Sequence, residues 1–181
     1  MEFIFTKFEG AWLIKPKVFQ DNRGFFLESY SKKLFDARGV QADFVQDNHS
    51  MSIQKNVLRG IHFQKPPHAQ AKLVRVVKGS VYDVIVDLRK NSSTYSQWEC
   101  FTLSAKNFQM LFVPRGFGHG FCTLEDNTEF LYKVDKFYAP EADAGIIWND
   151  PTLKIDWPIE NPILSEKDAK LPKFSELTTS F

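Results

Sequence analysis

The chain has 181 residues, of which 43% are hydrophobic and 15% aromatic, and this length suits one domain with a full core. Its net charge of +1 supplies no field of the kind that holds nucleic acid or an anionic membrane, and no apolar run approaches the ~20 residues that span a bilayer. Cys100 and Cys122 lack CxxC spacing and lie in apolar runs, which predicts reduced core residues of a cytoplasmic protein.

The N-terminal segment mixes apolar and basic residues around Pro16. Residues 11–19 (AWLIKPKVF) therefore predict an edge strand or an extended arm, because proline cannot donate a hydrogen bond inside a sheet. We expect this arm, about residues 1–30, to pair with a second subunit.

A turn and a short helix follow in the sequence. Residues 21–24 (DNRG) predict a turn, and residues 25–30 predict the strand that leaves it. Ser31 suits a helix N-cap and Gly39 the position after a helix end, which predicts a helix over residues 32–38.

From residue 44 onward the pattern is all-β. Short apolar runs, separated by Gly, Pro, Asn or Ser, predict strands at residues 73–77, 81–88, 98–103, 108–113, 120–124 and 128–134. Regular spacing of this kind indicates a sandwich or barrel in which alternate side chains enter one cavity, and Tyr132 is expected to point inward. The proline-rich tail, residues 138–181, is expected to wrap over the barrel, so the whole chain, residues 1–181, is predicted to be one domain with short peripheral helices.

Histidines raise the possibility of a metal site, and the sequence contains His49, His62, His68 and His119. Such a site needs three or four His, Cys or carboxylate ligands, often at HxH or HxxxH spacing. The second residue after His62 is Gln64, and residues 63–72 contain no acid. The sequence therefore predicts no metal.

Proton transfer is the alternative chemistry. Removing a proton beside a ketone requires a base, a cation or donor for the enolate oxygen, and an acid, which His62, Lys72 and Tyr132 could supply. On pattern alone, a histidine at the edge of the core, a surface lysine and a packed tyrosine are the commoner interpretation. Catalysis by these three residues stays one of two alternatives at this level.

The sequence also leaves open whether certain arginines bind phosphate and certain phenylalanines stack on a nucleobase. Arg23 and Arg59 each precede a glycine, which leaves open backbone through which a phosphate could approach the guanidinium group. Surface arginines in turns are the alternative. Phe19, Phe25 and Phe26 could stack on a nucleobase, although core packing is the usual role of phenylalanine.

Eight motifs occur in a fixed order along the chain, and they are residues 18–28 (VFQDNRGFFLE), 44–50 (FVQDNHS), 58–64 (LRGIHFQ), 72–76 (KLVRV), 83–89 (DVIVDLR), 114–121 (PRGFGHGF), 131–133 (LYK) and 148–151 (WNDP). Over about residues 15–170 the chain resembles the dTDP-4-dehydrorhamnose 3,5-epimerases, the RmlC-type family of the cupin superfamily. An ordered set of motifs is far more specific than any one of them.

The resemblance implies a cupin-like β-barrel, or jelly roll, in a cytoplasmic homodimer whose N-terminal strands cross between subunits. It implies an enzyme that uses no metal and no cofactor. The low net charge predicts that the protein binds neither nucleic acid nor membrane. The implied reaction, a step of dTDP-rhamnose biosynthesis, is epimerisation at C3 and C5 of dTDP-4-dehydro-6-deoxy-D-glucose through enolate intermediates, giving dTDP-4-dehydro-L-rhamnose.

The resemblance also implies roles for individual residues. His62 resembles the base, Asp168 its charged partner, Tyr132 the acid on the opposite face of the sugar, and Lys72 the cation beside the keto oxygen. Two implied diphosphate contacts are Arg59 and, from the neighbouring subunit, Arg23. The other residues of the predicted substrate-binding set are Phe26, Glu28, Gln46, Asp47, Asn48, His119, Tyr138, Asp143 and Lys167.

Four positions depart from the family pattern. Gly118 stands where alanine is common, Ala71 where glycine is usual, Phe137 where a second tyrosine often precedes Tyr138, and Asp143 where the substrate-contacting acid is commonly glutamate. None of these changes removes a catalytic group. Phe137 and Asp143 bear on the shape of the sugar pocket.

Several alternatives stay open. Asp83, on the strand face opposite Tyr82, is either a structural acid or a partner of His62. A mono-epimerase acting on a related nucleotide 4-keto-deoxysugar shares the same framework. A non-catalytic sugar-nucleotide-binding cupin and a metal-dependent cupin oxygenase are the alternatives from other classes.

Overall fold

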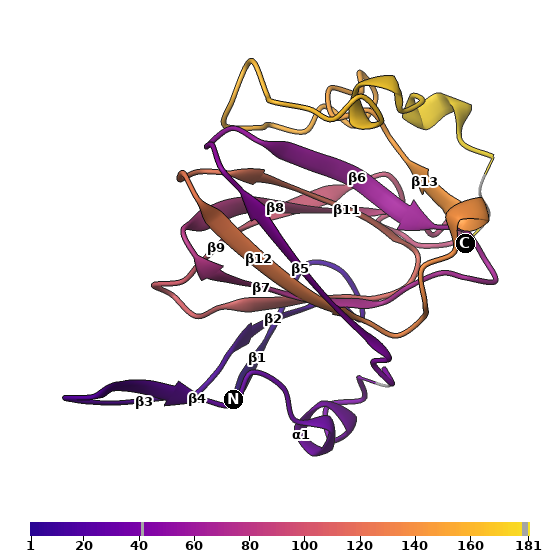
Figure 1. Ribbon diagram of the computed structural model, residues 1–181. Coiled ribbons are helices and arrows are strands. Elements are labelled where there is room, and N and C mark those ends of the chain that lie inside the picture. Colours follow the sequence, from indigo (N-terminus) through magenta and orange to yellow (C-terminus); the bar gives the residue numbers. More distant parts are fainter. Residues whose placement is uncertain (41, 179–180) are drawn as a thin grey trace.

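Two antiparallel sheets face each other in the computed structural model, which describes residues 1–40, 42–178 and 181 (Figure 1). The six-stranded sheet has the order β1 (Glu2–Phe5), β2 (Trp12–Lys15), β10 (Met110–Val113), β7 (Lys72–Lys78), β12 (Thr128–Val134), β5 (Gln46–Ser52). The five-stranded sheet has the order β13 (Asp143–Gly145), β6 (Leu58–Gln64), β11 (Phe117–Thr123), β8 (Ser80–Asp87), β9 (Trp98–Ser104). The all-β jelly-roll prediction is confirmed.

Apolar side chains from both sheets fill part of the space between them. Val74 and Phe130 enter from the six-stranded sheet, and Ile85 and Phe121 from the five-stranded sheet. The rings of Phe121 and Phe130 stack with centroids 4.1 Å apart. Because alternate residues of a strand face the same side, polar residues on these strands can line the rest of the same space.

The C-terminal segment covers the outer face of the five-stranded sheet (Figure 1). Leu153 and Trp157 pack against Val84 and Val86 of β8. The Trp98 indole donates a hydrogen bond to the Leu153 carbonyl oxygen at 3.0 Å. Three 3-10 turns lie in this region and the loop before it, η1 (Pro140–Ala142), η2 (Asp168–Lys170) and η3 (Phe174–Glu176).

A short helix packs against the outer face of the six-stranded sheet, beside the N-terminal strands β1 and β2 that belong to this sheet. Phe35 of helix α1 (Lys32–Asp36) packs beside Ile14 of β2 and Phe112 of β10. The edge-strand prediction for this region is wrong: β2 lies between β1 and β10, and Pro16 comes just after its last residue, where no ladder hydrogen bond is lost.

The helix ends earlier than predicted. Its last residue is Asp36 and its C-cap is Ala37, and the chain turns back at Gly39, which has a φ of +75°. Glycine adopts this left-handed conformation without the steric cost of a side chain, so its position after the helix end is confirmed.

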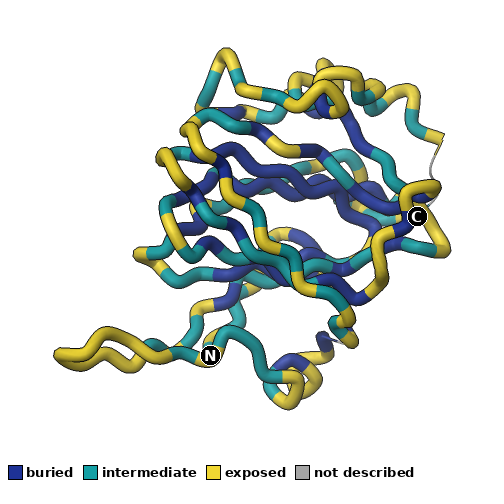
Figure 2. The backbone as a smooth tube through the Cα atoms, in the orientation of Figure 1, coloured by how far each residue is buried: buried dark blue, intermediate teal, exposed yellow. Residues whose placement is uncertain are grey.

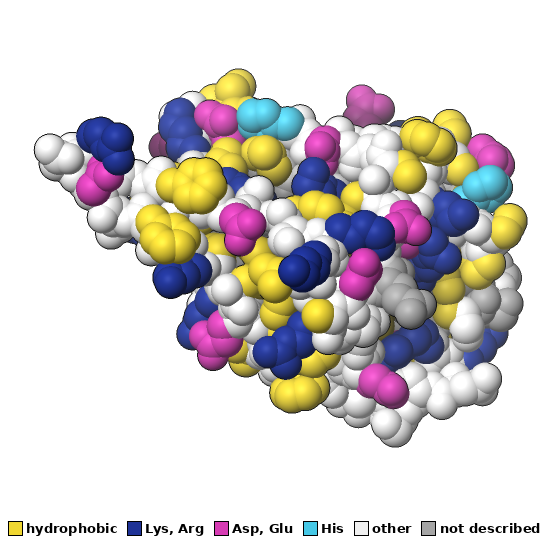
Figure 3. Space-filling view, turned by 90° about the horizontal axis from the view of Figure 1, so that it is seen from below, with side chains coloured by type: hydrophobic (Ala, Val, Ile, Leu, Met, Phe, Trp, Pro, Cys, Tyr) yellow, Lys and Arg dark blue, Asp and Glu magenta, His cyan; other side chains and the backbone are white. Residues whose placement is uncertain are grey.

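A hairpin formed by β3 (Val18–Asp21) and β4 (Gly24–Leu27) projects from the body of the protein (Figure 1). Figure 2 shows that most of the hairpin is exposed, and Figure 3 shows oppositely charged side chains near its tip and hydrophobic ones toward its base. Phe19, Phe25 and Phe26 are exposed by 51%, 58% and 68%. A large exposed apolar surface of this kind marks a binding surface.

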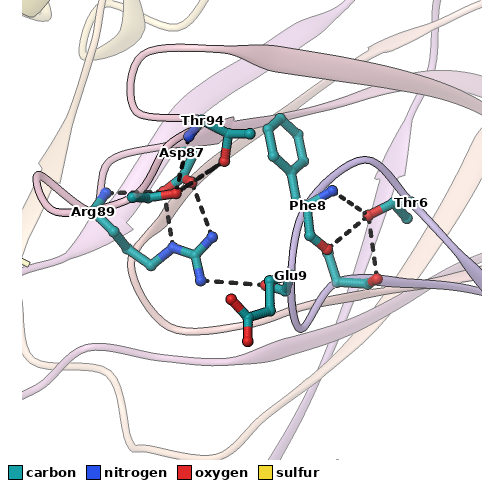
Figure 4. Close-up of polar contacts among 8 residues, drawn as sticks. Thr6, Phe8, Glu9, Asp87, Arg89 and Thr94 are labelled. Carbon is teal, nitrogen blue, oxygen red and sulfur yellow. Dashed lines mark hydrogen bonds and ion pairs between the residues drawn. The ribbon is translucent and has the colours of Figure 1, made fainter.

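Asp87, at the end of β8, anchors a network that joins the β8–β9 connection to the N-terminal turn (Figure 4). Its buried carboxylate accepts hydrogen bonds from Arg89, Ser92 and Thr94 at 2.6–3.0 Å. Arg89 also donates to the Glu9 carbonyl oxygen at 3.2 Å. Burial opposes ionisation of Asp87, but these hydrogen bonds prevail and lower its pKa to about 2.

Both cysteines are free thiols, and Cys122 is buried as predicted, whereas Cys100 is only partly buried against the outer apolar cluster. Within the described part of the chain, no helix has the length and apolar character that crossing a membrane requires.

Candidate active site

A cavity of about 290 Å³ opens between the two sheets. It is lined by Ser50, Arg59, His62, Lys72, His119, Phe121, Phe130, Tyr132, Ser165, Lys167 and Asp168. All four predicted catalytic residues therefore meet in one place, together with three of the predicted substrate-binding residues.

A bulge in β6 places Arg59 and His62 on the same face of the strand. His119 of β11 pairs with His62 and Phe121 pairs with Arg59, so three steps along β6 match two along β11. Without this irregularity, side chains three residues apart would point to opposite faces. Gly60 permits the bulge, because a Cβ there would lie 2.5 Å from the Gly120 Cα atom and the φ of Gly60 is +123°.

His62 and Asp168 form a hydrogen-bonded pair in the wall of the cavity. The distance between His62 Nε2 and Asp168 Oδ1 is 2.5 Å. Ser165 Oγ accepts a hydrogen bond from the Asp168 backbone N–H at 3.0 Å, which fixes the turn that presents the carboxylate. Burial opposes ionisation of Asp168, but the hydrogen bond and charge of His62 outweigh it and hold the pKa below its usual value.

Lys72 and Tyr132 enter the cavity from the six-stranded sheet, opposite His62. Lys72 is the first residue of β7, and its Nζ lies 3.4 Å from the His62 carbonyl oxygen. Burial lowers the pKa of Lys72 to about 8, against the opposing charges of Asp83 and Asp143. Burial raises the pKa of Tyr132, so this phenol keeps its proton at neutral pH.

Asp83 pairs with His119, not with His62. Both oxygens of its buried carboxylate lie 3.0–3.1 Å from His119 Nε2. The alternative that Asp83 is the partner of His62 is therefore wrong for this geometry, since Asp168 occupies that position. Burial raises the pKa of Asp83, and His119 and Lys72 oppose the rise.

Tyr138, Asp143 and Lys167 form a second polar cluster at the rim of the cavity. The Tyr138 hydroxyl donates a hydrogen bond to Asp143 Oδ2 at 3.0 Å, and the Lys167 ammonium group forms an ion pair with the same carboxylate. Lys167 also lines the cavity. Phe137 is 68% exposed, so this departure from the family pattern lies on the surface beside the rim.

Gly118 faces away from the cavity. It pairs with Val86, whose side chain lies in the outer apolar cluster, and a Cβ on Gly118 would lie 2.6 Å from Ile61 Cγ2. The departure at this position therefore concerns packing under the C-terminal segment. It leaves the shape of the cavity unchanged.

Strand β5 separates its predicted binding residues by face. Asn48 pairs with Tyr132 and Gln46 with Val134, and directly paired residues share a face, so both point toward the cavity side. The Gln46 amide donates to Asn48 Oδ1 at 2.8 Å. Asp47 points to the outer face, where it accepts from Lys133 Nζ at 2.7 Å, and it does not reach the cavity.

The predicted residues of the hairpin lie apart from the cavity of their own chain. Arg23 is in the β3–β4 turn, where it forms an ion pair with Asp21, and Phe26 lies on β4. Glu28 follows β4 directly. The single chain therefore brings together the catalytic set but not these three residues.

Four cavity residues were not predicted as site residues, namely Ser50, Phe121, Phe130 and Ser165. The first three lie two positions from a predicted residue on the same strand: Asn48, His119 and Tyr132. The two-residue period of a strand could have found them. Ser165 lies outside any strand, so no such period applies to it.

Among residues 1–40, 42–178 and 181, no three His, Cys, Asp or Glu side chains are grouped as metal ligands would be. The cavity instead gathers cationic side chains, with Arg59, Lys72 and Lys167 lining it. Its acids, Asp168 and the nearby Asp83, are each paired with a histidine. The arrangement suits an anionic ligand and proton transfer.

A jelly-roll sandwich whose interior brings an imidazole, a phenol and an ammonium group together is the framework of a cupin-type isomerase. The family model described as dTDP-4-dehydrorhamnose 3,5-epimerase matches residues 5–176. The chain belongs to this family.

Individual relatives cover nearly the whole chain. A dTDP-4-dehydrorhamnose 3,5-epimerase from Shigella flexneri is 50% identical over 96% of this chain and 96% of its own length. The crystal structure of such an epimerase from Bacillus anthracis, with TDP and PPi bound, is 52% identical, covers 95% of this chain and 98% of that chain, and has a TM-score of 0.93. The Legionella pneumophila enzyme in complex with dTDP-4-keto-L-rhamnose is 42% identical, covers 97% and 94%, and has a TM-score of 0.93.

Proposed function

We propose that this chain converts dTDP-4-dehydro-6-deoxy-D-glucose to dTDP-4-dehydro-L-rhamnose by inverting C3 and C5. Both carbons lie next to the 4-keto group, so each can lose a proton to give an enolate. The observation that carries the proposal is that His62 enters the cavity from the five-stranded sheet and Tyr132 from the six-stranded sheet. A planar enolate between the sheets meets a proton acceptor on one face and a proton donor on the other.

His62 is the proposed base. Nε2 lies toward Asp168, so the imidazole donates its Nε2 proton to the carboxylate and leaves Nδ1 as the acceptor. Asp168 stabilises the imidazolium ion that forms after proton abstraction. General base catalysis of this kind contributes about 10²- to 10⁴-fold in rate.

Tyr132 is the proposed acid. Its raised pKa keeps the hydroxyl protonated at neutral pH, and proton donation to the carbon from the side opposite His62 inverts the centre. Because the enolate carbon is reprotonated on the face from which no proton left, a single residue cannot perform both steps. The separation of base and acid on two sheets meets that requirement.

Lys72 is the proposed cation for the enolate oxygen. Lys72 lines the same cavity, where a low local dielectric strengthens the attraction of its ammonium group for a developing oxyanion. The net reaction transfers protons and changes no oxidation state, so proton donors, acceptors and a cation are sufficient, and no metal or cofactor is assigned.

Arg59 and Lys167 are the proposed diphosphate contacts within the chain, since both present positive charge to the cavity. Gln46 and Asn48 are the proposed contacts to the nucleotide and sugar, since both lie on the cavity side of β5. His119, Tyr138 and Asp143 are the proposed contacts to the sugar.

The nucleotide end of the site is proposed to be completed by a second subunit. Strand β5 is the edge of the six-stranded sheet beside the cavity, and the hairpin of the same chain presents exposed Phe26 and Arg23 away from its own body. In a homodimer, the hairpin of one subunit would lie against the cavity of the other, where Arg23 meets the diphosphate and Phe26 stacks on the base. Glu28, which follows β4, is proposed to contact the substrate bound by the partner subunit. We also propose that the protein is cytoplasmic.

The test is to incubate the protein with the 4-keto sugar nucleotide in D₂O and to locate deuterium in the product by NMR. Label at both C3 and C5 with inverted configuration supports the double epimerase. Label and inversion at one carbon selects the mono-epimerase, and absence of any label selects a sugar-nucleotide-binding protein without activity.

A further inference from the structure

A second histidine–carboxylate pair, formed by His119 and Asp83, lies beside the cavity. Asp83, in the middle of β8, faces the space between the sheets, and its carboxylate is fully buried. His119 of β11 lines the cavity, and its Nε2 lies 3.0 Å from one Asp83 oxygen and 3.1 Å from the other. The His119 ring stacks on Phe130, with centroids 6.2 Å apart. Within the described chain, the buried Asp83 carboxylate therefore has the His119 ring as its one side-chain hydrogen-bond partner.

Lys72 lines the same cavity as His119, the histidine that pairs with Asp83. The ionisable groups around the cavity come from every element that lines it: Arg59, His62, Asp83, His119, Tyr132, Asp143, Lys167 and Asp168. Burial lowers the pKa of Lys72 to about 8, and the charges of Asp83 and Asp143 oppose the fall. Asp143 lies at the rim, shared by Tyr138 and Lys167, whereas Asp83 is enclosed with no solvent to screen it.

We propose that Asp83 is a positioning residue for the reaction, which holds the His119 ring against the cavity wall and keeps the Lys72 ammonium group protonated where the keto oxygen binds. Asp83 does not touch the substrate, because His119 stands between its carboxylate and the open cavity. The role given to Lys72 rests on the function proposed above. The electrostatic coupling between Asp83 and Lys72 does not.

Two physical effects support this role. A buried ammonium group without a compensating carboxylate loses its proton at lower pH, and a neutral amine stabilises an oxyanion far less than a cation does. A histidine ring held by both oxygens of one carboxylate also keeps a fixed orientation at the cavity wall. Asp83→Asn preserves the shape of the carboxyl group and one hydrogen-bond acceptor but removes the negative charge.

The test is a pH titration of Lys72 in the protein without substrate. NMR of lysine labelled with ¹³C at Cε monitors the titration, and Lys72→Arg identifies the Lys72 signal. Asp83→Asn is expected to move the Lys72 midpoint to lower pH by about one unit or more. The matched control is Asp87→Asn, which removes a buried carboxylate from the same strand outside the cavity and should leave the Lys72 midpoint in place. An unchanged midpoint in a folded Asp83→Asn protein would overturn the proposal.

A reciprocal measurement covers the case in which Asp83→Asn does not fold. In Lys72→Met, the Asp83 carboxyl should titrate at higher pH than in the unmodified chain, because coupling between two sites is mutual. No change there contradicts the proposal as well. Neither titration needs turnover. The titrations can therefore contradict the role of Asp83 while the D₂O experiment supports the proposed function, and they can support that role when the D₂O experiment does not support the function.

With substrate, Asp83→Asn should lower kcat and move the alkaline limb of the kcat profile to lower pH by the same shift as the Lys72 midpoint. The affinity for dTDP should stay within about twofold of the unmodified chain, because the nucleotide binds at the other end of the site. If Asp83 had only a structural role, Asp83→Asn would lower both kcat and the affinity for dTDP and would leave the alkaline limb of the kcat profile at the same pH.

Discussion

His62 and Asp168 are 106 residues apart in sequence, and His62 Nε2 lies 2.5 Å from Asp168 Oδ1 in the structure. The strand that carries His62 and the C-terminal turn that carries Asp168 are therefore both required to form the proposed base. The C-terminal segment contributes to the site as well as to the packing of the barrel.

Asp168→Asn should lower kcat by about 10²-fold, because a neutral amide cannot stabilise the imidazolium ion that proton abstraction produces. Steady-state kinetics with the 4-keto sugar nucleotide measure the effect. Asp156→Asn, in the same C-terminal segment but outside the cavity, is the control and should keep full activity. A loss of less than about threefold in Asp168→Asn would remove the carboxylate from the mechanism.

Arg59→Ala should weaken binding of dTDP by about tenfold or more, because it removes a cation that faces the cavity. Calorimetric titration with dTDP measures this affinity. Arg38→Ala removes an arginine at the end of the helical turn, outside the cavity, and should leave the affinity unchanged. Equal affinity in both variants would place the diphosphate elsewhere.

Complementation between subunits tests the shared site. Arg23→Ala and His62→Ala chains should each be inactive or nearly so, but mixed dimers contain one complete site if the hairpin serves the partner's cavity. Random mixing then restores about one quarter of full activity. If Arg23 serves its own subunit, the mixture gains nothing over the average of its parents.

Asp87 should stabilise the fold at neutral pH and lose this effect in acid. Its pKa in the folded chain, about 2, lies below the value of about 3.9 in an unfolded chain, so its contribution of about 2 kcal/mol is complete above pH 5 and declines as the pH falls toward 2. Urea unfolding of Asp87→Asn at pH 7 should show a loss of this size, and the loss should shrink at pH 3. The exposed Asp43→Asn is the control. A loss independent of pH would contradict the electrostatic origin.

The strand pattern and the inward orientation of Tyr132 could be predicted from the sequence because alternation and turn residues are local signals. The positions of Arg59 and His62 on one face could not, since they depend on a bulge that the partner strand β11 determines. The choice of Asp168 over Asp83 as the partner of His62 depends on where the C-terminal turn packs. From the residues alone it stays undetermined, and only the family resemblance pointed to Asp168.

The position of β2 in its sheet also depends on contacts that the local sequence does not reveal. Pro16 correctly marks a strand end, but whether β2 is an edge or an inner strand is decided by β1, which pairs along its other side. Asp47 and Asn48 are adjacent in a predicted binding motif, yet the pleat sends them to opposite faces.

The central claim is that a base on one sheet and an acid on the other share each inversion, and deuterium exchange in two variants tests it directly. His62→Asn should abolish wash-in of deuterium at both C3 and C5. Tyr132→Phe should retain exchange while inversion of configuration falls by about 10²-fold. Exchange that survives in His62→Asn, or inversion that proceeds at the full rate in Tyr132→Phe, would contradict the account.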